Sequence, residues 1–372
     1  MNIALLGFGV VGKGVYDLTK SIPGLTVTKV VCLEDVSLPD ATVTKDFKDV
    51  LSDDIDIVIE AMGGLHPAFE FVSAAMEAGK HVVTSNKALV ANFYDTLLPL
   101  AQRKGICFRC TAAVGGGIGW LSELERSRRT QTIQAVGGIM NGTCNYILDS
   151  MTRLGLGYDE ALKQAQQLGY AEANPTTDVE GIDTWHKVIL SSNVAFEISL
   201  DSTTVPVAGI SRIRKEDVDT FTAKGLVCKL ISTGKQSGGQ YSAYVQPTLV
   251  ASTALEAAVP ANYNLITLEG EASGRMSFYG QGAGRYPTAH NVVQDCADVM
   301  AGKGFYCGYG EKTAAANTDC LRYYVRGNAD SWLKDNTAEN WNTGVLTKPV
   351  CVNDIHNWLK DHPEAFIAAI KE

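Results

Sequence analysis

A glycine-rich loop near the start of the chain is the feature that most restricts its fold. Gly7, Gly9 and Gly12 form a GxGxxG pattern directly after an apolar run, and a helical pattern follows at once. The first glycine permits a tight turn, the second lets a pyrophosphate approach the backbone, and the third lets helix and strand pack closely. Val10 and Val11 would offer the unpaired N–H groups of the helix start to the phosphates. In this context the pattern predicts a dinucleotide-binding βαβ unit rather than a flexible turn.

The first third of the chain alternates short apolar runs with helical patterns, which is typical of a parallel sheet covered by helices. The predicted strands are residues 2–8, 27–33, 55–60, 81–84 and 107–111, and the predicted helices include residues 67–78 and 91–104.

The pattern changes after three consecutive glycines, Gly115 to Gly117, and favours a mixed sheet with helices on one face. Strands are predicted at residues 133–140, 229–233, 241–246 and 276–279, and helices at residues 145–153, 159–168, 178–196, from about 288, and 352–371.

The second predicted strand ends beside a carboxylate that bears on cofactor choice. Glu34 lies 22 residues beyond Gly12, where a carboxylate accepts hydrogen bonds from the adenine ribose hydroxyls and repels a 2′-phosphate. No arginine is adjacent in the sequence. NAD is therefore favoured over NADP.

The bulk composition excludes several classes of protein. A formal net charge of −9 argues against a nucleic-acid or anionic-membrane surface, and no apolar run approaches a membrane-spanning length. Nine cysteines, an odd number spread along the chain, do not form a disulfide framework, which predicts a reducing, cytoplasmic location. A small polar substrate is the partner that remains.

Asp183 and Lys187 are spaced i and i+4 on the predicted helix 178–196, with Asp178 as its expected N-cap. Such a spacing is most often a surface ion pair worth a few tenths of a kcal/mol. A separate apolar stripe on the same helix predicts that its opposite side packs on the sheet, so the lysine can point into a cleft.

Several segments together resemble the homoserine dehydrogenase family, in consistent order over roughly residues 1–310. They are residues 60–64 (EAMGG), 79–89 (GKHVVTSNKAL), 141–148 (NGTCNYIL), 169–172 (GYAE) with the following segment to Lys187, and 279–284 (YGQGAG). The resemblance implies reversible reduction of aspartate 4-semialdehyde to homoserine by NAD(P)H in a homodimer.

The resemblance also implies roles for individual residues. Lys187 and Asp183 would form the catalytic pair, and Lys87 would lie where nicotinamide and substrate meet. Descriptions of the family differ on whether the lysine at position 87 or the one at position 187 handles the proton. The residues implied to bind substrate are Glu172, Gly142 and Thr143, and those implied or predicted to bind the cofactor are Gly7, Gly9, Val10, Val11, Gly12, Glu34, Gly63, Asn86, Lys87 and Gly282.

The expected fold is α/β, with an N-terminal Rossmann-like domain and an α+β catalytic and dimerisation domain containing a mixed sheet. The expected ranges are residues 1–132 for the dinucleotide-binding domain, 133–290 for the catalytic domain, 291–318 for a helix returning to the first domain, and 319–372 for a C-terminal appendage. The appendage is either a truncated ligand-binding module of the ACT type or a plain structural extension.

The chain departs from the family pattern at several positions around the expected site. Thr111 stands where an acidic residue helps hold a monovalent cation, which argues against a sodium site. Gly119 followed by Trp120 replaces a proline, Asn174 replaces an aspartate, and Trp185 replaces a smaller residue. These departures motivate an alternative, a paralogous NAD-dependent dehydrogenase acting on a related amino-acid aldehyde or alcohol. A nucleotide sensor without turnover is disfavoured because it has no need of Lys87, Glu172, Asp183 and Lys187 together.

Overall fold

The computed structural model describes residues 1–304 and 310–371 and divides the chain into two compact units. Unit 1 consists of Met1–Thr130, Asn193–Ser199 and Gly280–Thr313, and unit 2 consists of Gln131–Ser192, Leu200–Tyr279 and Ala314–Glu372. The expected first domain has two segments, residues 1–132 and 291–318, whereas each unit draws on three segments. Residues 305–309, within the expected segment 291–318, lie outside the described residues.

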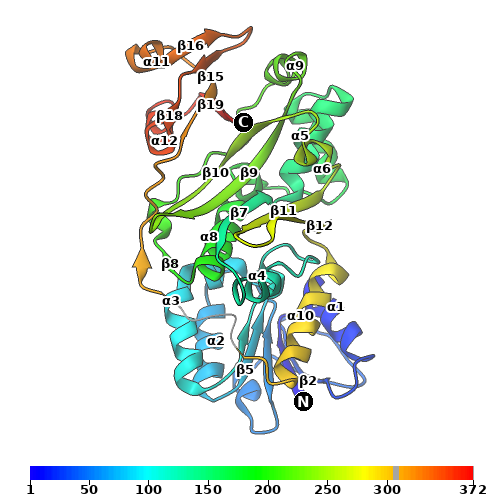
Figure 1. Ribbon diagram of the computed structural model, residues 1–372. Coiled ribbons are helices and arrows are strands. Elements are labelled where there is room, and N and C mark those ends of the chain that lie inside the picture. The colour runs from blue at the N-terminus through cyan, green and yellow to red at the C-terminus, as the bar shows by residue number, and fades with distance from the viewer. Residues whose placement is uncertain (305–309, 372) are drawn as a thin grey trace. The chain divides into compact units, whose positions relative to one another are not determined.

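Unit 1 is built on a six-stranded parallel sheet with the order β3-β2-β1-β4-β5-β6. Its strands are β1 (Asn2–Leu6), β2 (Thr26–Val31), β3 (Thr42–Thr44), β4 (Ile57–Glu60), β5 (His81–Thr84) and β6 (Phe108–Arg109). The helices α2 (Ala68–Glu77) and α3 (Lys87–Lys104) cover one side, and α1 (Val10–Thr19) and α10 (Arg285–Met300) the other (Figure 1). All four residues of β4 are buried, which is why this strand is apolar without alternation.

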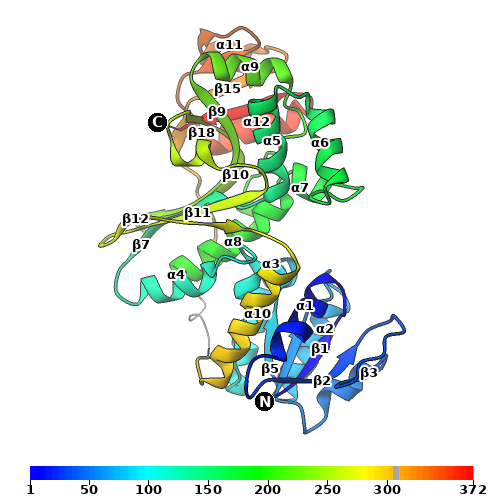
Figure 2. The same ribbon diagram turned by 90° about the vertical axis from the view of Figure 1, so that its right-hand side faces the viewer.

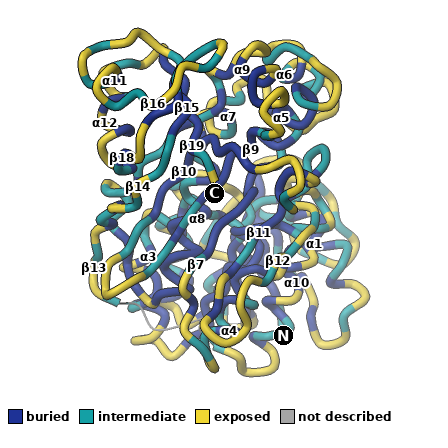
Figure 3. The backbone as a smooth tube through the Cα atoms, turned by 45° about the horizontal axis from the view of Figure 1, so that its top comes forward, coloured by how far each residue is buried: buried dark blue, intermediate teal, exposed yellow. Residues whose placement is uncertain are grey.

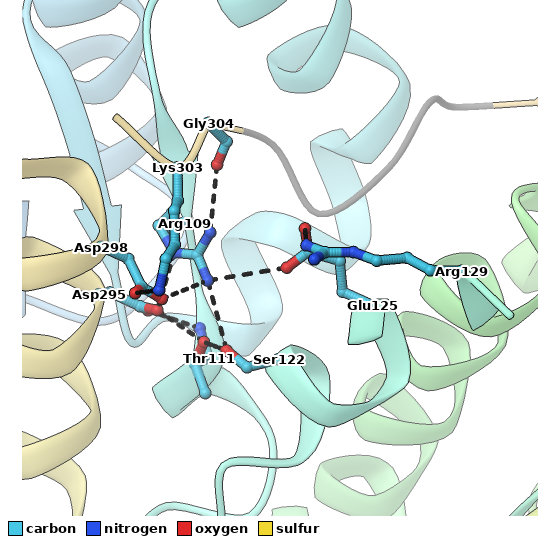
Figure 4. A network of polar contacts seen from close by, with 9 residues as sticks. All are labelled: Arg109, Thr111, Ser122, Glu125, Arg129, Asp295, Asp298, Lys303 and Gly304. Atoms are coloured by element: carbon cyan, nitrogen blue, oxygen red, sulfur yellow. Dashed lines mark hydrogen bonds and ion pairs between the residues drawn. The ribbon is translucent and has the colours of Figure 1, made fainter. Parts of the chain in front are cut away.

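The helix α10 joins unit 1 although it follows the N-terminal segments by more than 150 residues of chain. It packs against α1, where a Cβ on Gly14 would meet the Ala289 Cβ at 2.8 Å. The buried Arg109 guanidinium also ties the end of β6 to α10 (Figure 4): its Nε donates to Asp295 Oδ1 at 3.1 Å and its Nη2 lies 2.9 Å from Asp298 Oδ2. The same network includes α4 (Trp120–Arg128), through Ser122 and Glu125.

Unit 2 is built on a nine-stranded mixed sheet with the order β12-β11-β7-β9-β10-β19-β15-β17-β16. Its first five strands in this order are β12 (Gly274–Gln281), β11 (Tyr263–Gly270), β7 (Ile133–Ile139), β9 (Leu226–Ser237) and β10 (Gln240–Ala251). The neighbours from β11 to β10 pair antiparallel. The helices of this part are α5 (Gly142–Leu154), α6 (Tyr158–Gln167), α7 (Thr176–Val179), α8 (Ile182–Phe196) and α9 (Lys215–Ala223). The middle of β10 is buried throughout, and Figure 3 shows buried backbone in the middle of β9 and in the second half of β7 as well.

Apart from the two-residue strand β18 (Val350–Cys351), which belongs to a separate sheet, the C-terminal segment has the order of elements βαββαβ. These elements are β15 (Tyr323–Arg326), α11 (Ser331–Asn336), β16 (Thr337–Asn340), β17 (Val345–Thr347), α12 (Val352–Asp361) and β19 (Phe366–Ile370). The strands lie in the order β19-β15-β17-β16, which places the last strand beside the first as in ferredoxin-like modules. We call these six elements the C-terminal module. Because β19 also pairs in parallel with β10, this module continues the nine-stranded sheet of unit 2 (Figure 2).

The structure confirms the fold class: a parallel-sheet dinucleotide-binding domain and a second domain with a mixed sheet. Two expected elements differ. The helix expected at residues 352–371 ends at Asp361 and the chain returns as the buried strand β19. The long helix begins at Ile182, so Asp178 is not its N-cap but lies within the short α7. Within the described residues, no helix is long and apolar enough to cross a bilayer.

Candidate active site

The glycine loop of unit 1 lies at the switch point of the sheet, between β1 and β4, where the chain crosses from one half of the sheet to the other. In open α/β sheets ligands bind beside the carboxyl ends of the strands at this point. Gly7 has a φ of +92°, and a Cβ there would meet the Ala61 carbonyl oxygen at 2.8 Å. A Cβ on Gly9 would meet nothing within 4 Å, so the loop is open above its second glycine.

Glu60, at the carboxyl end of β4, organises the neighbouring loops although no role was predicted for it. Its buried carboxylate accepts hydrogen bonds from the Met62 and Gly63 N–H groups at 2.8 and 3.0 Å and from Thr84 Oγ1 at 2.6 Å. The position of Gly63 is therefore set by a side chain of the preceding strand. A glutamate that ends an otherwise apolar strand was the available sequence signal.

Asn86 caps the helix α3, with its Oδ1 accepting from the Leu89 N–H at 3.1 Å. Its Nδ2 donates to the Gly64 carbonyl oxygen at 2.7 Å, which joins the loops after β4 and β5. Lys87 is the first residue of α3 and partly buried. Gly282 lies against Gly116, because a Cβ on Gly116 would meet the Gly282 carbonyl oxygen at 2.6 Å.

Glu34 is exposed beyond the end of β2 and lines a hollow of about 370 Å³. The neighbouring Asp35 lines the same hollow, and Lys45 forms a 2.9 Å ion pair with it. The hollow therefore carries two carboxylates and one lysine that is already paired.

In unit 2 the Asp183–Lys187 pair is buried, with each residue less than a tenth exposed, and is not the surface pair that its spacing most often indicates. Lys187 Nζ donates to Asp183 Oδ2 and to the Met140 carbonyl oxygen, both at 2.6 Å. An ammonium has three N–H donors. The described residues accept two of those of Lys187, so one remains for a ligand.

Asn141 connects this pair to Asp178. Its Nδ2 donates to Asp183 Oδ2 at 2.9 Å and to Asp178 Oδ1 at 2.7 Å, while its Oδ1 caps α5 by accepting from the Cys144 N–H at 2.8 Å. Burial, and then the charge of Asp183, raise the pKa of Asp178. Sequence reasoning assigned Asp178 only a capping role, because its approach to Asp183 depends on the turn between α7 and α8.

The other predicted substrate residues surround the start of α5. A Cβ on Gly142 would meet the Asn262 carbonyl oxygen at 2.5 Å, so a larger residue does not fit there. Thr143 Oγ1 donates to the Tyr170 carbonyl oxygen at 2.5 Å, which ties the loop before α7 to α5. Glu172 lies two residues further along that loop and is exposed.

The departures from the family pattern have structural partners. Thr111 is buried, and both its N–H and its Oγ1 donate to Asp295, at 2.8 and 2.6 Å (Figure 4). Trp120 is fully buried at the start of α4, and Trp185 Nε1 donates to the Val205 carbonyl oxygen at 2.9 Å. No cluster of three or more His, Cys, Asp or Glu side chains suited to a metal ion occurs among the described residues.

Comparison with known proteins gives consistent matches over the whole chain. Residues 120–297 match the family model for homoserine dehydrogenase, and residues 7–110 match the model for its NAD-binding domain. The chain is 35% identical over 361 residues to a homoserine dehydrogenase of Bacillus subtilis, covering 90% of this chain and 83% of the relative. It is 38% identical over 322 residues to one of Corynebacterium glutamicum, covering 82% and 72%. The crystal structure of a homoserine dehydrogenase from Thiobacillus denitrificans superposes with a TM-score of 0.88 at 29% identity, covering 100% of this chain and 98% of that one.

Proposed function

Because the chain belongs to the homoserine dehydrogenase family, we propose that it catalyses the reversible NAD(P)H-dependent reduction of L-aspartate 4-semialdehyde to L-homoserine. The chain is an oxidoreductase with a nicotinamide dinucleotide-binding domain. The observation that carries the proposed substrate chemistry is the hydrogen-bond network in unit 2 that joins the buried Lys187, Asp183 and Asn141 to the half-buried Asp178.

The open glycine loop fits a dinucleotide. The space above Gly9 and the start of α1 would receive the pyrophosphate, and Gly7, Val10, Val11 and Gly12 would surround it. Further contacts would come from the loops ordered by Glu60, that is from Gly63, Asn86 and Lys87, and from Gly282. When bound, the nicotinamide supplies the hydride.

We propose NAD rather than NADP as the preferred cofactor. The hollow beside β2 carries Glu34 and Asp35, and Lys45 is paired with Asp35. A 2′-phosphate placed there would meet carboxylate charge, whereas ribose hydroxyls would donate to Glu34. No monovalent cation is proposed at Thr111, because that side chain donates to Asp295 instead of offering a carboxylate.

Lys187 is the residue we propose to act on the substrate oxygen. A carbonyl carbon that accepts a hydride leaves negative charge on its oxygen, which a fixed ammonium can stabilise and protonate. Asp183 accepts a hydrogen bond from Lys187 Nζ and so orients the ammonium, and Asn141 holds Asp183 in place. Lys87 is the alternative proton donor, and substitution of each lysine separates the two.

The substrate's own charges have counterparts in unit 2. Glu172 would accept the substrate ammonium as a charge-assisted contact. The N–H groups of Gly142 and Thr143, at the start of the 13-residue helix α5, would bind the carboxylate.

The first test is the absorbance of reduced cofactor with purified protein and aspartate semialdehyde, with NADH and NADPH compared side by side. We expect rapid oxidation, with NADH preferred. If NADH binds but is not consumed, the proposed substrate is wrong and a related aldehyde becomes the next candidate.

We also propose that the protein is a cytoplasmic homodimer, on the basis of the family resemblance and the cysteine composition. Sedimentation should give twice the chain mass of 39.9 kDa. The C-terminal module is proposed to be a complete ACT-like regulatory module rather than a truncated one, because its four strands have the order β19-β15-β17-β16.

A further inference from the structure

Two cysteines far apart in the sequence face each other on the short sheet formed by β14 (Cys320–Leu321) and β18 (Val350–Cys351). The strands are antiparallel, and Cys320 is directly opposite Cys351. The Val352 N–H donates to the Asp319 carbonyl oxygen at 3.0 Å, one residue outside the pair, so the cysteines occupy a non-hydrogen-bonded position. In such positions the Cα atoms are about 4.5 Å apart and the side chains are closest.

This geometry is suited to a disulfide bond. The two Sγ atoms lie 2.8 Å apart. A Cα separation of about 4.5 Å lies within the range found in disulfides, so the bond needs no movement of the two strands.

The pair also differs from the other cysteines in its access to solvent. Cys320 is exposed and Cys351 is half-buried, whereas the remaining described cysteines are all buried. Thiols buried in apolar surroundings are inert, and burial raises the pKa of Cys228 to about 12. Among the described residues, an oxidant in solution therefore reaches this pair first.

We propose that Cys320 and Cys351 form a reversible dithiol–disulfide site that reacts with low-molecular-weight disulfides. In a reducing cytoplasm the pair rests as two thiols, and it closes when the thiol pool is oxidised.

The order of attack by the two sulfurs follows first from access, because Cys320 is exposed whereas Cys351 is half-buried. The hydrogen bond with Cys320 raises the pKa of Cys351 to about 11, so Cys351 keeps its proton at neutral pH. Cys320, as its thiolate, attacks one sulfur of the oxidant, breaks the oxidant's S–S bond and releases one thiolate. Cys351 then loses its proton to water, attacks the Cys320 sulfur and displaces the second thiolate. The pair gives up two electrons and two protons, and the oxidant becomes two thiols.

The bond would join the segment that leads into the C-terminal module to the segment between β17 and α12 within it. Cys320 precedes β15 and Cys351 precedes α12, so the closed loop contains β15, α11, β16 and β17. Cys320, Leu321 and Arg322 also line a cavity of about 460 Å³, together with Pro349. Oxidation therefore adds a covalent cross-link to the module at the wall of this cavity. The cross-link reduces the conformational freedom of the unfolded chain.

The test uses the full chain with Cys307→Ser, which removes the cysteine outside the described residues. The reduced protein is treated with oxidised glutathione, free thiols are alkylated, and peptides are mapped by mass spectrometry. We expect an intramolecular Cys320–Cys351 disulfide, reversed by dithiothreitol. Retention of both thiols, a stable glutathione adduct on Cys320 in this parent, or a bond to another cysteine would overturn the proposal.

Two further variants test the order of attack. Cys351→Ser should accumulate a glutathione adduct at Cys320, because the second thiol is missing. Cys320→Ser should react much more slowly at Cys351, and equal rates would contradict the assigned order. Oxidation should raise the melting temperature of the parent by several degrees and leave that of Cys320→Ser unchanged. An unchanged melting temperature in the oxidised parent would contradict the stabilising effect of the cross-link.

Discussion

At the scale of single residues, burial converts a common helical ion pair into a candidate catalytic group. Asp183 and Lys187 are one turn apart on α8, as are Lys215 and Asp219 on α9. The Asp183–Lys187 pair is nearly inaccessible to solvent, and Asn141 links it to Asp178. The Lys215–Asp219 pair is exposed. Spacing alone does not distinguish the two pairs.

Replacing Lys187 by alanine should lower kcat about 10²- to 10⁴-fold, the usual effect of losing a general acid. Binding of NADH, measured by fluorescence, should be unchanged, because the dinucleotide site belongs to unit 1. Lys215→Ala is the matched control and should keep full activity. If Lys187→Ala retains most of its turnover and Lys87→Ala does not, the proton donor is Lys87.

We propose that Glu34 sets the cofactor preference through its carboxylate, which lines the hollow beside β2. Glu34→Ala should raise the KM for NADH and lower that for NADPH, because a ribose acceptor is lost together with a charge that repels phosphate. Steady-state kinetics with both cofactors measure this change. Asp35→Ala is the control for general charge, and an equal change of preference there would rule out a specific role of Glu34.

At the scale of elements, buried charges connect strands to helices. Lys229 on β9 is fully buried, and its Nζ donates at 2.9 Å both to Asn145 Oδ1 on α5 and to the Val259 carbonyl oxygen. Burial lowers the pKa of Lys229 to about 8. The ammonium therefore has a desolvation cost that its partners offset only in part.

This lysine should give a pH dependence of stability. Between about pH 8 and pH 10 the folded protein holds Lys229 neutral while the unfolded chain binds the proton, so stability rises with pH. The slope from this group approaches about 1.4 kcal/mol per pH unit. The free energy of unfolding, measured with denaturant, should increase more steeply with pH in the parent than in Lys229→Met, which lacks the titrating group. A difference that does not vary over this range would show that Lys229 is not desolvated.

Arg109 ties β6 to α10, and removing its buried partner should destabilise unit 1. Asp295→Ala leaves the guanidinium short of a carboxylate and also removes the acceptor of Thr111, at a cost of about 3–5 kcal/mol. Asp298→Ala, on the same helix but more exposed, should cost much less. Thermal unfolding compares the two, and equal losses would contradict the role assigned to burial.

At the scale of the whole molecule, the strands of the C-terminal module are part of the nine-stranded sheet of unit 2 and do not form a separate sheet. The last strand pairs with both β10 and β15, and Lys371 N–H donates to the Leu249 carbonyl oxygen at 2.9 Å. Removing the module leaves β10 as an unpaired edge, which is a template for aggregation.

A chain truncated before residue 319 should therefore aggregate or lose thermal stability. Light scattering after size exclusion measures this, and Lys371→Ala, which keeps the strand but not its ion pair with Glu256, should remain monodisperse. A truncated chain that is monodisperse and fully active would mean that the module is a plain extension.

The sequence by itself was sufficient for the dinucleotide-binding fold, the mixed second sheet and the residues to examine. Those inferences depend on local patterns: glycines between a strand and a helix, apolar runs, and the i, i+4 spacing of Asp183 and Lys187. Tertiary structure alone decided what those residues contact. The roles of Glu60 and Asp178, the burial of Lys229 and the meeting of Cys320 with Cys351 arise from contacts between distant segments. The final strand was mistaken for a helix because its partner β10 lies more than 100 residues earlier, and sheet pairing overrides local periodicity.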